Sequence, residues 1–356
     1  MNERFGDEQE RRYRLLHSSS AGSSSAETRT SASDFVREGD ERSFIIAVRP
    51  PFRLDLTVWA LRRRPINELD RWDGSVYRRT IHVGGIPVGL AVTQVGFDDT
   101  PRLRVRVSRA CGRARVETAV RRVLNHVLGL GIDLTGFYAV AAAEPPLDDL
   151  ANWFRGMRPP RFPSVFEALV NGVACQQLSL QAGLTLLNRL VGAFGRSPGP
   201  PEEGGGKAFP PPQVLARVDK GLLQALGFSR AKTLAISEIA IAAARGELEY
   251  ETLANLDDAA ACTRLEELRG VGRWTAEYVL LRGCGRLNIF PGDDVGARNN
   301  LQKWLRRKRP LNYESTKKLL QRWQPYAGLV YLHLLLKRID DQAMMTAARN
   351  PPGCRM

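Results

Sequence analysis

Residues 265–281 read LEELRGVGRWTAEYVLL and contain the strongest structural signal in the chain. Apolar residues recur at helical spacing on both sides of Gly270-Val271-Gly272, so the stretch predicts two helices joined by a tight turn. Two glycines around one small apolar residue let the backbone approach another group closely. The amides that begin the second helix have no partner within it, so they can bind a phosphate.

An ordinary corner between two helices would also use Gly-x-Gly. The stretch is not a dinucleotide-binding loop, because it lacks the preceding strand and the third glycine of that motif. The segment at 287–298, LNIFPGDDVGAR, favours a functional site. Phe290-Pro291-Gly292 predicts a rigid turn, and Asp293-Asp294 stand where the next helix begins. The sequence therefore predicts a helix, a turn, a second helix and a paired carboxylate that starts a third.

Two features of this region each have two interpretations. Asp294 is an N-cap, which is a common use of aspartate, or a carboxylate that faces a cleft and is kept ionised by the helix dipole. Trp274 and Tyr278 share one helix face at i, i+4 spacing, so they either pack into the core or form the wall of a pocket. The motif alone leaves both questions open.

Three further segments strengthen the pattern: RPPRFPSVFEALVNGVACQQLSLQAG at 158–183, LQALGFSRAKTLAISEIA at 223–240 and RWQPYAGLVYLHLL at 322–335. Together with LxGVGRWTAEY and the Asp-Asp pair, they resemble the helix-hairpin-helix DNA glycosylase superfamily. Within it, the sequence is similar to the bacterial 3-methyladenine DNA glycosylase II family, which repairs alkylated bases. The resemblance covers nearly everything except the N-terminal tail.

The resemblance implies a role for each motif residue. Asp294 would be the catalytic carboxylate, Trp274 and Tyr278 would be walls of the base pocket, and Gln177 would be the wedge that fills the duplex when a nucleotide is flipped out. The hairpin would bind DNA through Gly270, Val271, Gly272, Arg273 and Thr275. A structural Na⁺ or K⁺ ion would be held by the backbone carbonyls of Glu266, Leu268 and Val271.

The resemblance also implies what the enzyme does not use. Glycosylases with a lyase step need an amine nucleophile in the hairpin, and here Trp274 follows Gly272-Arg273 in place of a lysine. Only Cys354 follows the catalytic region, so we expect no iron–sulfur cluster and no other cofactor. The expected enzyme is a monofunctional DNA glycosylase that excises bases of the 3-methyladenine and 7-methylguanine type. The alternatives are a non-catalytic DNA-binding or damage-recognition protein and a glycosylase for oxidised or deaminated bases.

The chain divides by composition into four parts. Residues 1–42 form a Ser-rich stretch that predicts a disordered tail. Residues 43–147 predict an α+β accessory domain with a small antiparallel sheet, built from strands at 76–83, 86–95 and 102–108 and a helix at 117–130. Gly84-Gly85 separates the first two strands and predicts a hairpin turn. Residues 148–342 predict an all-α glycosylase domain pair with a flexible, exposed loop at 197–212, and residues 343–356 a C-terminal tail.

The charge of the chain fits this expectation. Its 356 residues carry 52 Lys+Arg against 38 Asp+Glu, a net charge of +14. Residues 1–42 contribute seven Arg and nine Asp+Glu, so the positive excess belongs to the body of the protein, as in nucleic-acid-binding proteins. No apolar run approaches the roughly 18 residues of a membrane helix, and the N-terminus is charged where a signal peptide would be apolar. We expect a cytoplasmic monomer whose partner is damaged double-stranded DNA.

Overall fold

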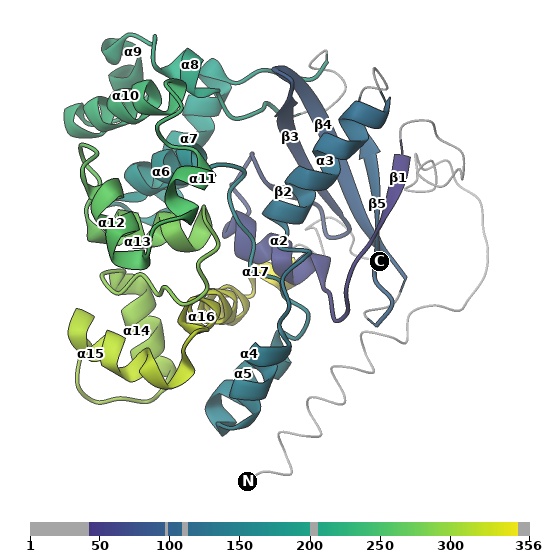
Figure 1. Ribbon diagram of the computed structural model, residues 1–356, viewed down its shortest axis with the longest axis vertical. Helices are drawn as coiled ribbons and strands as arrows, with labels where there is room; N and C mark the ends of the chain where they lie inside the picture. Colours follow the sequence, from purple (N-terminus) through teal and green to yellow (C-terminus); the bar gives the residue numbers. More distant parts are fainter. Residues whose placement is uncertain (1–42, 97–98, 109–112, 200–205, 348–356) are drawn as a thin grey trace. The chain divides into compact units, whose positions relative to one another are not determined.

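The computed structural model describes residues 43–96, 99–108, 113–199 and 206–347. The expected Ser-rich tail at 1–42 and residues 348–356 of the expected C-terminal tail lie outside this range. The described chain begins with a five-stranded antiparallel sheet in the order β1-β5-β4-β3-β2 (Figure 1). Its strands are β1 (Ser43–Ala47), β2 (Arg71–Trp72), β3 (Val76–Val83), β4 (Ile86–Val95) and β5 (Arg102–Val107).

The β3–β4 hairpin confirms the predicted turn. Gly84 and Gly85 both have positive φ, at 58° and 79°, and Val83 pairs with Ile86 across them. Two successive residues of positive φ form the turn whose twist matches that of paired strands. The antiparallel sheet with its helices is therefore the expected α+β N-terminal domain.

Two helices pack on one face of this sheet. One is α3 (Arg113–Val127), which was expected at 117–130 and begins four residues earlier. The other is α2 (Leu54–Arg62), which the sequence did not reveal because eight of its nine residues are buried. A helix buried on all sides has no polar face to mark the helical period.

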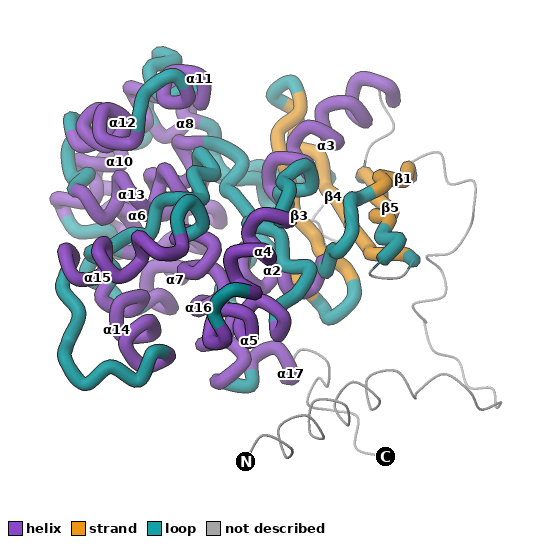
Figure 2. The backbone as a smooth tube through the Cα atoms, turned by 60° about the horizontal axis from the view of Figure 1, so that its bottom comes forward, coloured by secondary structure: helices purple, strands orange, loops and turns teal. Residues whose placement is uncertain are grey.

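The rest of the described chain is helical (Figure 2). The helices between the sheet and the predicted loop are α4 (Thr135–Ala142), α5 (Pro145–Trp153), α6 (Val165–Cys175) and α7 (Leu180–Phe194). After the loop come α8 (Pro212–Leu215), α9 (Lys220–Ala225), α10 (Arg230–Ala244), α11 (Tyr250–Ala254), α12 (Asp258–Glu266) and α13 (Arg273–Arg282). The last are α14 (Val295–Trp304), α15 (Tyr313–Leu320), the 3₁₀ helix η3 (Gln321–Trp323), α16 (Ala327–Asp341) and α17 (Met344–Ala347).

These helices form two apolar cores, which agrees with the expected all-α domain pair. Buried residues of α6, α7, α10, α12 and α13 share one core, and those of α4, α5, α14 and α16 share the other. The expected domain boundary at 147/148 falls within α5. Helix α4, which precedes that boundary in the sequence, packs with helices near the end of the chain because its apolar face needs their cover.

The described end of the predicted loop at 197–212 is packed and not exposed. Ala208 is completely buried, and the ring of Phe209 lies edge-on to Phe166 of α6 with centroids 5.9 Å apart. The amide of Ala208 donates to the carbonyl of Arg196 at 2.8 Å. Residues 200–205, in the middle of this loop, lie outside the described range.

A buried ionic cluster ties the sheet to the helical core. Arg79 of β3 donates to Asp70 and to Glu167 of α6, both at 2.5 Å, and all three side chains are at most 5% exposed. Tyr77 also donates to Asp70, at 2.8 Å. Removal of one partner from such a cluster leaves an uncompensated buried charge, so the cluster holds α6 in a defined place against the sheet.

In the described part of the chain, no helix has the length and apolar character needed to cross a membrane.

Candidate active site and nucleic-acid interface

The predicted hairpin lies between α12 and α13 and has the expected tight turn. Gly270 has φ +75°, and a Cβ there would lie 2.8 Å from the Cβ of Ala235, so this position requires glycine. A Cβ built on Gly272 meets no described atom within 4 Å, and Gly272 is exposed. The first bond of α13 runs from the Ala276 amide to the Gly272 carbonyl at 3.0 Å, so the four amides at 272–275 have no partner within the helix.

Gln176, the residue that follows α6, fixes this turn with two hydrogen bonds. Its Nε2 donates to the Gly270 carbonyl and to the hydroxyl of Thr275, both at 2.8 Å. Thr275 is only 1% exposed. The hydroxyl of Thr275 therefore points into the protein, where it accepts the hydrogen bond from Gln176, and the expected contact of Thr275 with DNA stays a prediction. Its amide is one of the four that have no partner within α13.

Asp294 is the N-cap of α14, and it is also held from a second helix. Its Oδ1 accepts a hydrogen bond from the Ala297 amide at 2.8 Å, which confirms the capping interpretation. Its Oδ2 accepts a hydrogen bond from the hydroxyl of Tyr331 of α16 at 3.2 Å. The side chain is half-buried, and the neighbouring Val295 is 59% exposed. A carboxylate with both oxygens fixed next to an open edge can serve as a cap and still face a ligand.

The turn before Asp294 is anchored by α13. Glu277 is 8% exposed; its Oε2 accepts the Gly292 amide at 2.9 Å and its Oε1 accepts the Tyr313 hydroxyl at 2.7 Å. Burial raises the pKa of Glu277 above its ordinary value. The hairpin helix thus positions the turn that presents Asp294.

Trp274 and Tyr278 lie together on α13 as the spacing predicts. Their rings stack with centroids 5.5 Å apart and an angle of 22° between planes. Tyr278 is 4% exposed and belongs to the helical core, whereas Trp274 is half-buried. The Tyr278 hydroxyl accepts a hydrogen bond from Arg63 Nη1 at 2.9 Å and donates to Asn171 Oδ1 at 3.3 Å.

Gln177 lies at the surface, between α6 and α7. It is exposed and has φ +53°, a left-handed conformation that is uncommon for a residue other than glycine. Lys232 of α10 fixes the backbone before it, because its Nζ donates to the carbonyls of Ala174 and Gln176 at 2.9 and 2.8 Å. Leu178, the next residue, is also exposed, at 46%. The position is therefore a rigid, protruding turn.

Arg273 is already engaged by neighbouring side chains. Its guanidinium forms an ion pair with Asp293 at 2.7 Å and lies 3.8 Å from the ring centroid of Tyr313. The side chain is 49% exposed, so one face of it stays accessible. The pairing reduces the positive charge that Arg273 presents to a phosphate.

Unpaired positive charge is concentrated at the C-terminal end of α14 and in the segment that leads to α15. Five exposed cations occupy seven positions here, and the described residues provide no ion-pair partner for them: Lys303, Arg306, Arg307, Lys308 and Arg309. The backbone of this basic loop (residues 303–309) is fixed by Gln302, whose carbonyl accepts the Arg307 amide at 3.0 Å and whose Nε2 donates to the Arg307 carbonyl at 3.2 Å. Tyr313, four residues after the basic loop, contacts Arg273 at the start of α13.

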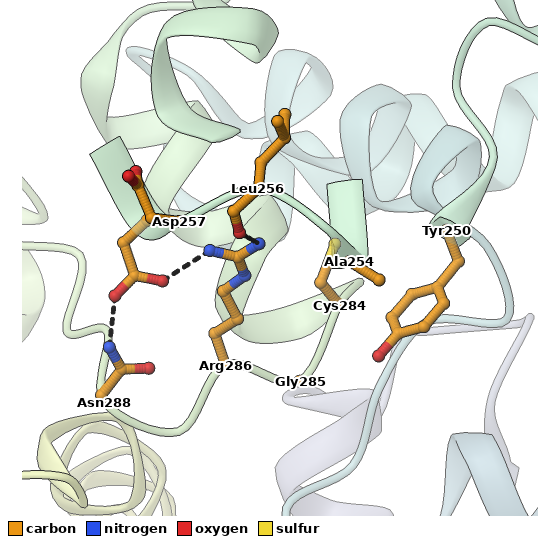
Figure 3. A pocket seen from close by; sticks show the side chains of 9 residues that line it. Tyr250, Ala254, Leu256, Asp257, Cys284, Gly285, Arg286 and Asn288 are labelled. Carbon is orange, nitrogen blue, oxygen red and sulfur yellow. Dashed lines mark hydrogen bonds and ion pairs between the residues drawn. The ribbon is translucent and has the colours of Figure 1, made fainter. Parts of the chain in front are cut away.

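A pocket after the C-terminal end of α13 contains none of the predicted site residues (Figure 3). Arg286 there donates to Asp258 at 2.6 Å and to the carbonyls of Leu253 and Leu256 at 2.6 and 2.7 Å. Asn288 donates to the other oxygen of Asp258. These polar groups are satisfied within the protein, so the pocket has a structural explanation.

The expected monovalent cation would be bound by backbone atoms of the hairpin and not by side chains. No group of three or more His, Cys, Asp or Glu among the described residues could hold a metal ion. The expected ligands are instead the backbone carbonyls of Glu266, Leu268 and Val271. The Leu268 carbonyl accepts the Val271 amide at 3.1 Å and keeps its second lone pair, which suits a monovalent ion. The ion stays a prediction.

Comparison with known proteins agrees with this geometry. Residues 170–325 match the family model of the HhH-GPD superfamily base excision DNA repair proteins, and residues 43–164 match the AlkA N-terminal domain. The chain is 37% identical over 216 residues to the DNA-3-methyladenine glycosylase of Bacillus subtilis, covering 58% of this chain and 69% of that protein. It is 29% identical over 293 residues to DNA-3-methyladenine glycosylase 2 of Escherichia coli, covering 80% and 94%.

A solved structure gives the same result. The 3-methyladenine DNA-glycosylase from Archaeoglobus fulgidus superimposes with a TM-score of 0.72 at 25% identity, covering 84% of this chain and 98% of that one. The fold and site define a helix-hairpin-helix base excision repair protein, and the chain belongs to this superfamily. Within it, the chain belongs to the AlkA family of 3-methyladenine DNA glycosylases. The resemblance seen in the sequence is confirmed.

Sequence reasoning missed the residues that hold the site from other parts of the chain. They are Arg63, Asn171, Gln176 and Tyr331. Asn171, Gln176 and Tyr331 fall in segments that carried the resemblance, but no spacing linked them to Asp294 or Tyr278. Arg63 follows the unrecognised helix α2.

Tyr331→Phe tests the positioning of Asp294. The change removes one hydrogen bond to the carboxylate and leaves the ring, which lies edge-on to Phe290 at 5.5 Å, in place. Because a hydrogen bond to a charged group contributes about 1.5 kcal/mol or more, we expect the single-turnover rate of base excision to fall about tenfold. Duplex binding should stay unchanged.

Tyr326→Phe is the control, because Tyr326 also belongs to the start of α16 but its ring packs on Phe137. An equal loss in both variants, or no loss in Tyr331→Phe, would show that the hydroxyl does not position Asp294.

Proposed function

We propose that this protein is a monofunctional DNA glycosylase that excises alkylated bases from duplex DNA by hydrolysis. One observation carries the proposal: Asp294 is fixed by the Ala297 amide and the Tyr331 hydroxyl, on the helix that follows the DNA-binding hairpin. A binding module needs the hairpin alone, and a helix cap does not require the second hydrogen bond, from Tyr331, to the carboxylate. The relatives named 3-methyladenine DNA glycosylases support the same substrate class.

The chemistry needs one ionised carboxylate. An alkylated purine such as 7-methylguanine carries positive charge, so it takes the electron pair of the C1′–N bond and leaves as a neutral base. The sugar then carries oxocarbenium-like charge, which Asp294 stabilises electrostatically. Water bonds to C1′ and loses a proton, and the product is an abasic site. No general acid is required, because the leaving group is already activated.

The base must leave the duplex before this reaction, at a cost of a few kcal/mol that is smaller for damaged bases. Gln177, on its protruding turn, would fill the gap in the base stack and can hydrogen-bond the orphaned partner base. Trp274 and Tyr278 would face the flipped base. A cation over such a ring gains roughly 0.5–2 kcal/mol.

The duplex would be held without reading its sequence. The amides at 272–275 would bind one phosphate at the positive end of the α13 dipole. Because Arg273 is paired with Asp293, we assign further phosphate contacts to the basic loop. Contacts to phosphates position a protein on DNA and do not depend on the bases.

The absence of a lyase step is supported by the chemistry of the hairpin. A Schiff base needs a free amine next to C1′. Trp274 stands where a hairpin lysine would be, and the amine of Lys232, whose pKa is lowered by burial, already donates to two carbonyls.

The function is tested by base release from methylated duplex DNA under single-turnover conditions. We expect free 3-methyladenine and 7-methylguanine to appear and the strands to stay intact until the abasic sites are cleaved with alkali. The same reaction run with borohydride should give no covalent protein–DNA adduct. Tight duplex binding with no released base would favour the non-catalytic alternative, and a trapped adduct would overturn the monofunctional assignment.

The basic loop is tested by the salt dependence of binding to undamaged duplex. Each phosphate contact contributes about 0.9 to the slope of log K against log [salt]. The triple variant Arg307→Gln, Lys308→Gln, Arg309→Gln should therefore lower the slope by up to about 2.7 and weaken binding to all sequences alike. The charge-matched control changes Arg102, Arg104 and Arg115 of the N-terminal domain to Gln. An equal effect of both triple variants would contradict a specific contact by the loop.

A further inference from the structure

Arg63 is a buried cation whose position depends on an uncommon backbone conformation. It follows the last residue of α2 and has φ +64°. That backbone conformation is unfavourable for a residue other than glycine. Such a conformation is kept only where the surrounding structure requires it. Arg63 is 5% exposed, and it donates to the Tyr278 hydroxyl at 2.9 Å and to Asn171 Oδ1 at 3.0 Å. The N-terminal domain thus places a positive charge at the edge of the Tyr278 ring.

No carboxylate in the described part of the chain forms an ion pair with Arg63, and Asp70, which is paired with Arg79, attracts it only at longer range. The two acceptors of Arg63 are a phenol and an amide, both neutral. A second buried cation, Arg282, is 1% exposed, and its hydrogen-bond acceptors among the described residues are the carbonyls of Ala60 and Leu61, at 3.0 and 3.4 Å. Both guanidinium groups lie over the ring of Phe162, at 5.7 and 5.3 Å from its centroid. Burial of an unpaired charge lowers the free energy of unfolding, so a purely structural role does not explain why two arginines are buried here.

The effect of Arg63 on the reaction depends on the charge of the departing base. A cationic base leaves as a neutral molecule, and a buried cation at the edge of the Tyr278 ring repels it while it is bound. The hydrogen bond from Arg63 also draws electron density toward the Tyr278 oxygen, which weakens the attraction between the ring and a cation.

A neutral purine behaves in the opposite way. It takes the electron pair of the C1′–N9 bond and leaves as an anion, which then accepts a proton from water while the remaining hydroxide oxygen bonds to C1′. A fixed positive charge close to the base stabilises the negative charge that develops in this transition state. The same charge therefore opposes one class of substrate and assists the other.

We propose that Arg63 is a specificity-determining residue that shifts excision from cationic N-methylpurines toward neutral purine lesions. The inference rests on the proposed function, because it takes Tyr278 as a wall of the base site. Arg63 acts through Tyr278 and through its charge, and it does not take part in bond making. The chemical class that it favours is a purine lesion that carries no charge while it is bound to the sugar.

The test compares single-turnover rates on two duplexes, one with a single hypoxanthine and one with a single 7-methylguanine. Arg63→Gln removes the charge and keeps hydrogen-bonding groups for Tyr278 and Asn171. We expect the ratio of the hypoxanthine rate to the 7-methylguanine rate to fall at least tenfold. Arg63→Lys keeps the charge, so its ratio should stay within about threefold of that of the wild type.

Arg62→Gln is the matched control. Arg62 is also 5% exposed at the end of α2, but it donates to the carbonyls of Trp72 and Pro65. Its loss should lower stability and leave the ratio unchanged. If Arg63→Gln does not fold, Arg63→Met removes the charge and keeps an unbranched side chain, and a fall in the ratio is again expected.

The outcomes separate the two proposals. If both rates fall equally in folded Arg63→Gln, the ratio is unchanged, Arg63 is only structural and the inference is overturned, while the proposed function stands. If the wild type releases neither base, the proposed function fails and this inference fails with it. A ratio that falls in Arg63→Gln and not in Arg62→Gln supports both.

Discussion

The two hydrogen bonds to Asp294 are the constraint on which the site depends. The Ala297 amide fixes one oxygen at the start of α14, and the Tyr331 hydroxyl fixes the other from α16. Glu277 of the hairpin helix holds the turn that leads into α14. A carboxylate that must face the sugar of a flipped nucleotide needs this precision, because electrostatic stabilisation works only when the charge is already in place. The hairpin and the carboxylate are therefore parts of one rigid unit.

The N-terminal domain contributes more than an accessory surface. Arg79 of the sheet is buried between Asp70 and Glu167 of α6, which fixes the domain against the helix that ends at Gln176. Arg63, which follows helix α2, donates a hydrogen bond to the hydroxyl of Tyr278. Through these two contacts the sheet domain supports the hairpin and places a buried positive charge beside Tyr278, the proposed wall of the base site. Such buried, directional contacts specify one arrangement of the parts, because the alternatives leave buried charge unpaired.

The parts of the structure that follow local rules could be predicted from the sequence. The glycine pairs at 84–85 and 270–272 mark a strand turn and a helix turn, and Asp294 caps the helix that was expected to follow it. The stacking of Trp274 on Tyr278 follows from their i, i+4 spacing. Each of these features depends on residues a few positions apart, which is the range over which backbone geometry carries information.

The parts that depend on distant contacts could not be predicted. Arg63 and Tyr278 are separated by 215 positions, and Asp294 and Tyr331 by 37. The burial of Thr275 results from packing against α6, which no pattern around the hairpin reveals. Helix α2 was missed because it is buried nearly all round. In each case tertiary packing, and not local preference, decides the environment of the residue.

The central claim is that Asp294, and not its neighbour, is the catalytic carboxylate. The most direct measurement is the single-turnover rate of 7-methylguanine release by Asp294→Asn and Asp293→Asn, with duplex affinity measured in parallel. Asparagine caps a helix about as well as aspartate, so α14 should persist in the first variant. We predict that Asp294→Asn loses at least about a hundredfold in rate with its affinity retained, and that Asp293→Asn stays near the wild-type rate. A wild-type rate in Asp294→Asn, or an equal loss in both variants, would contradict the account.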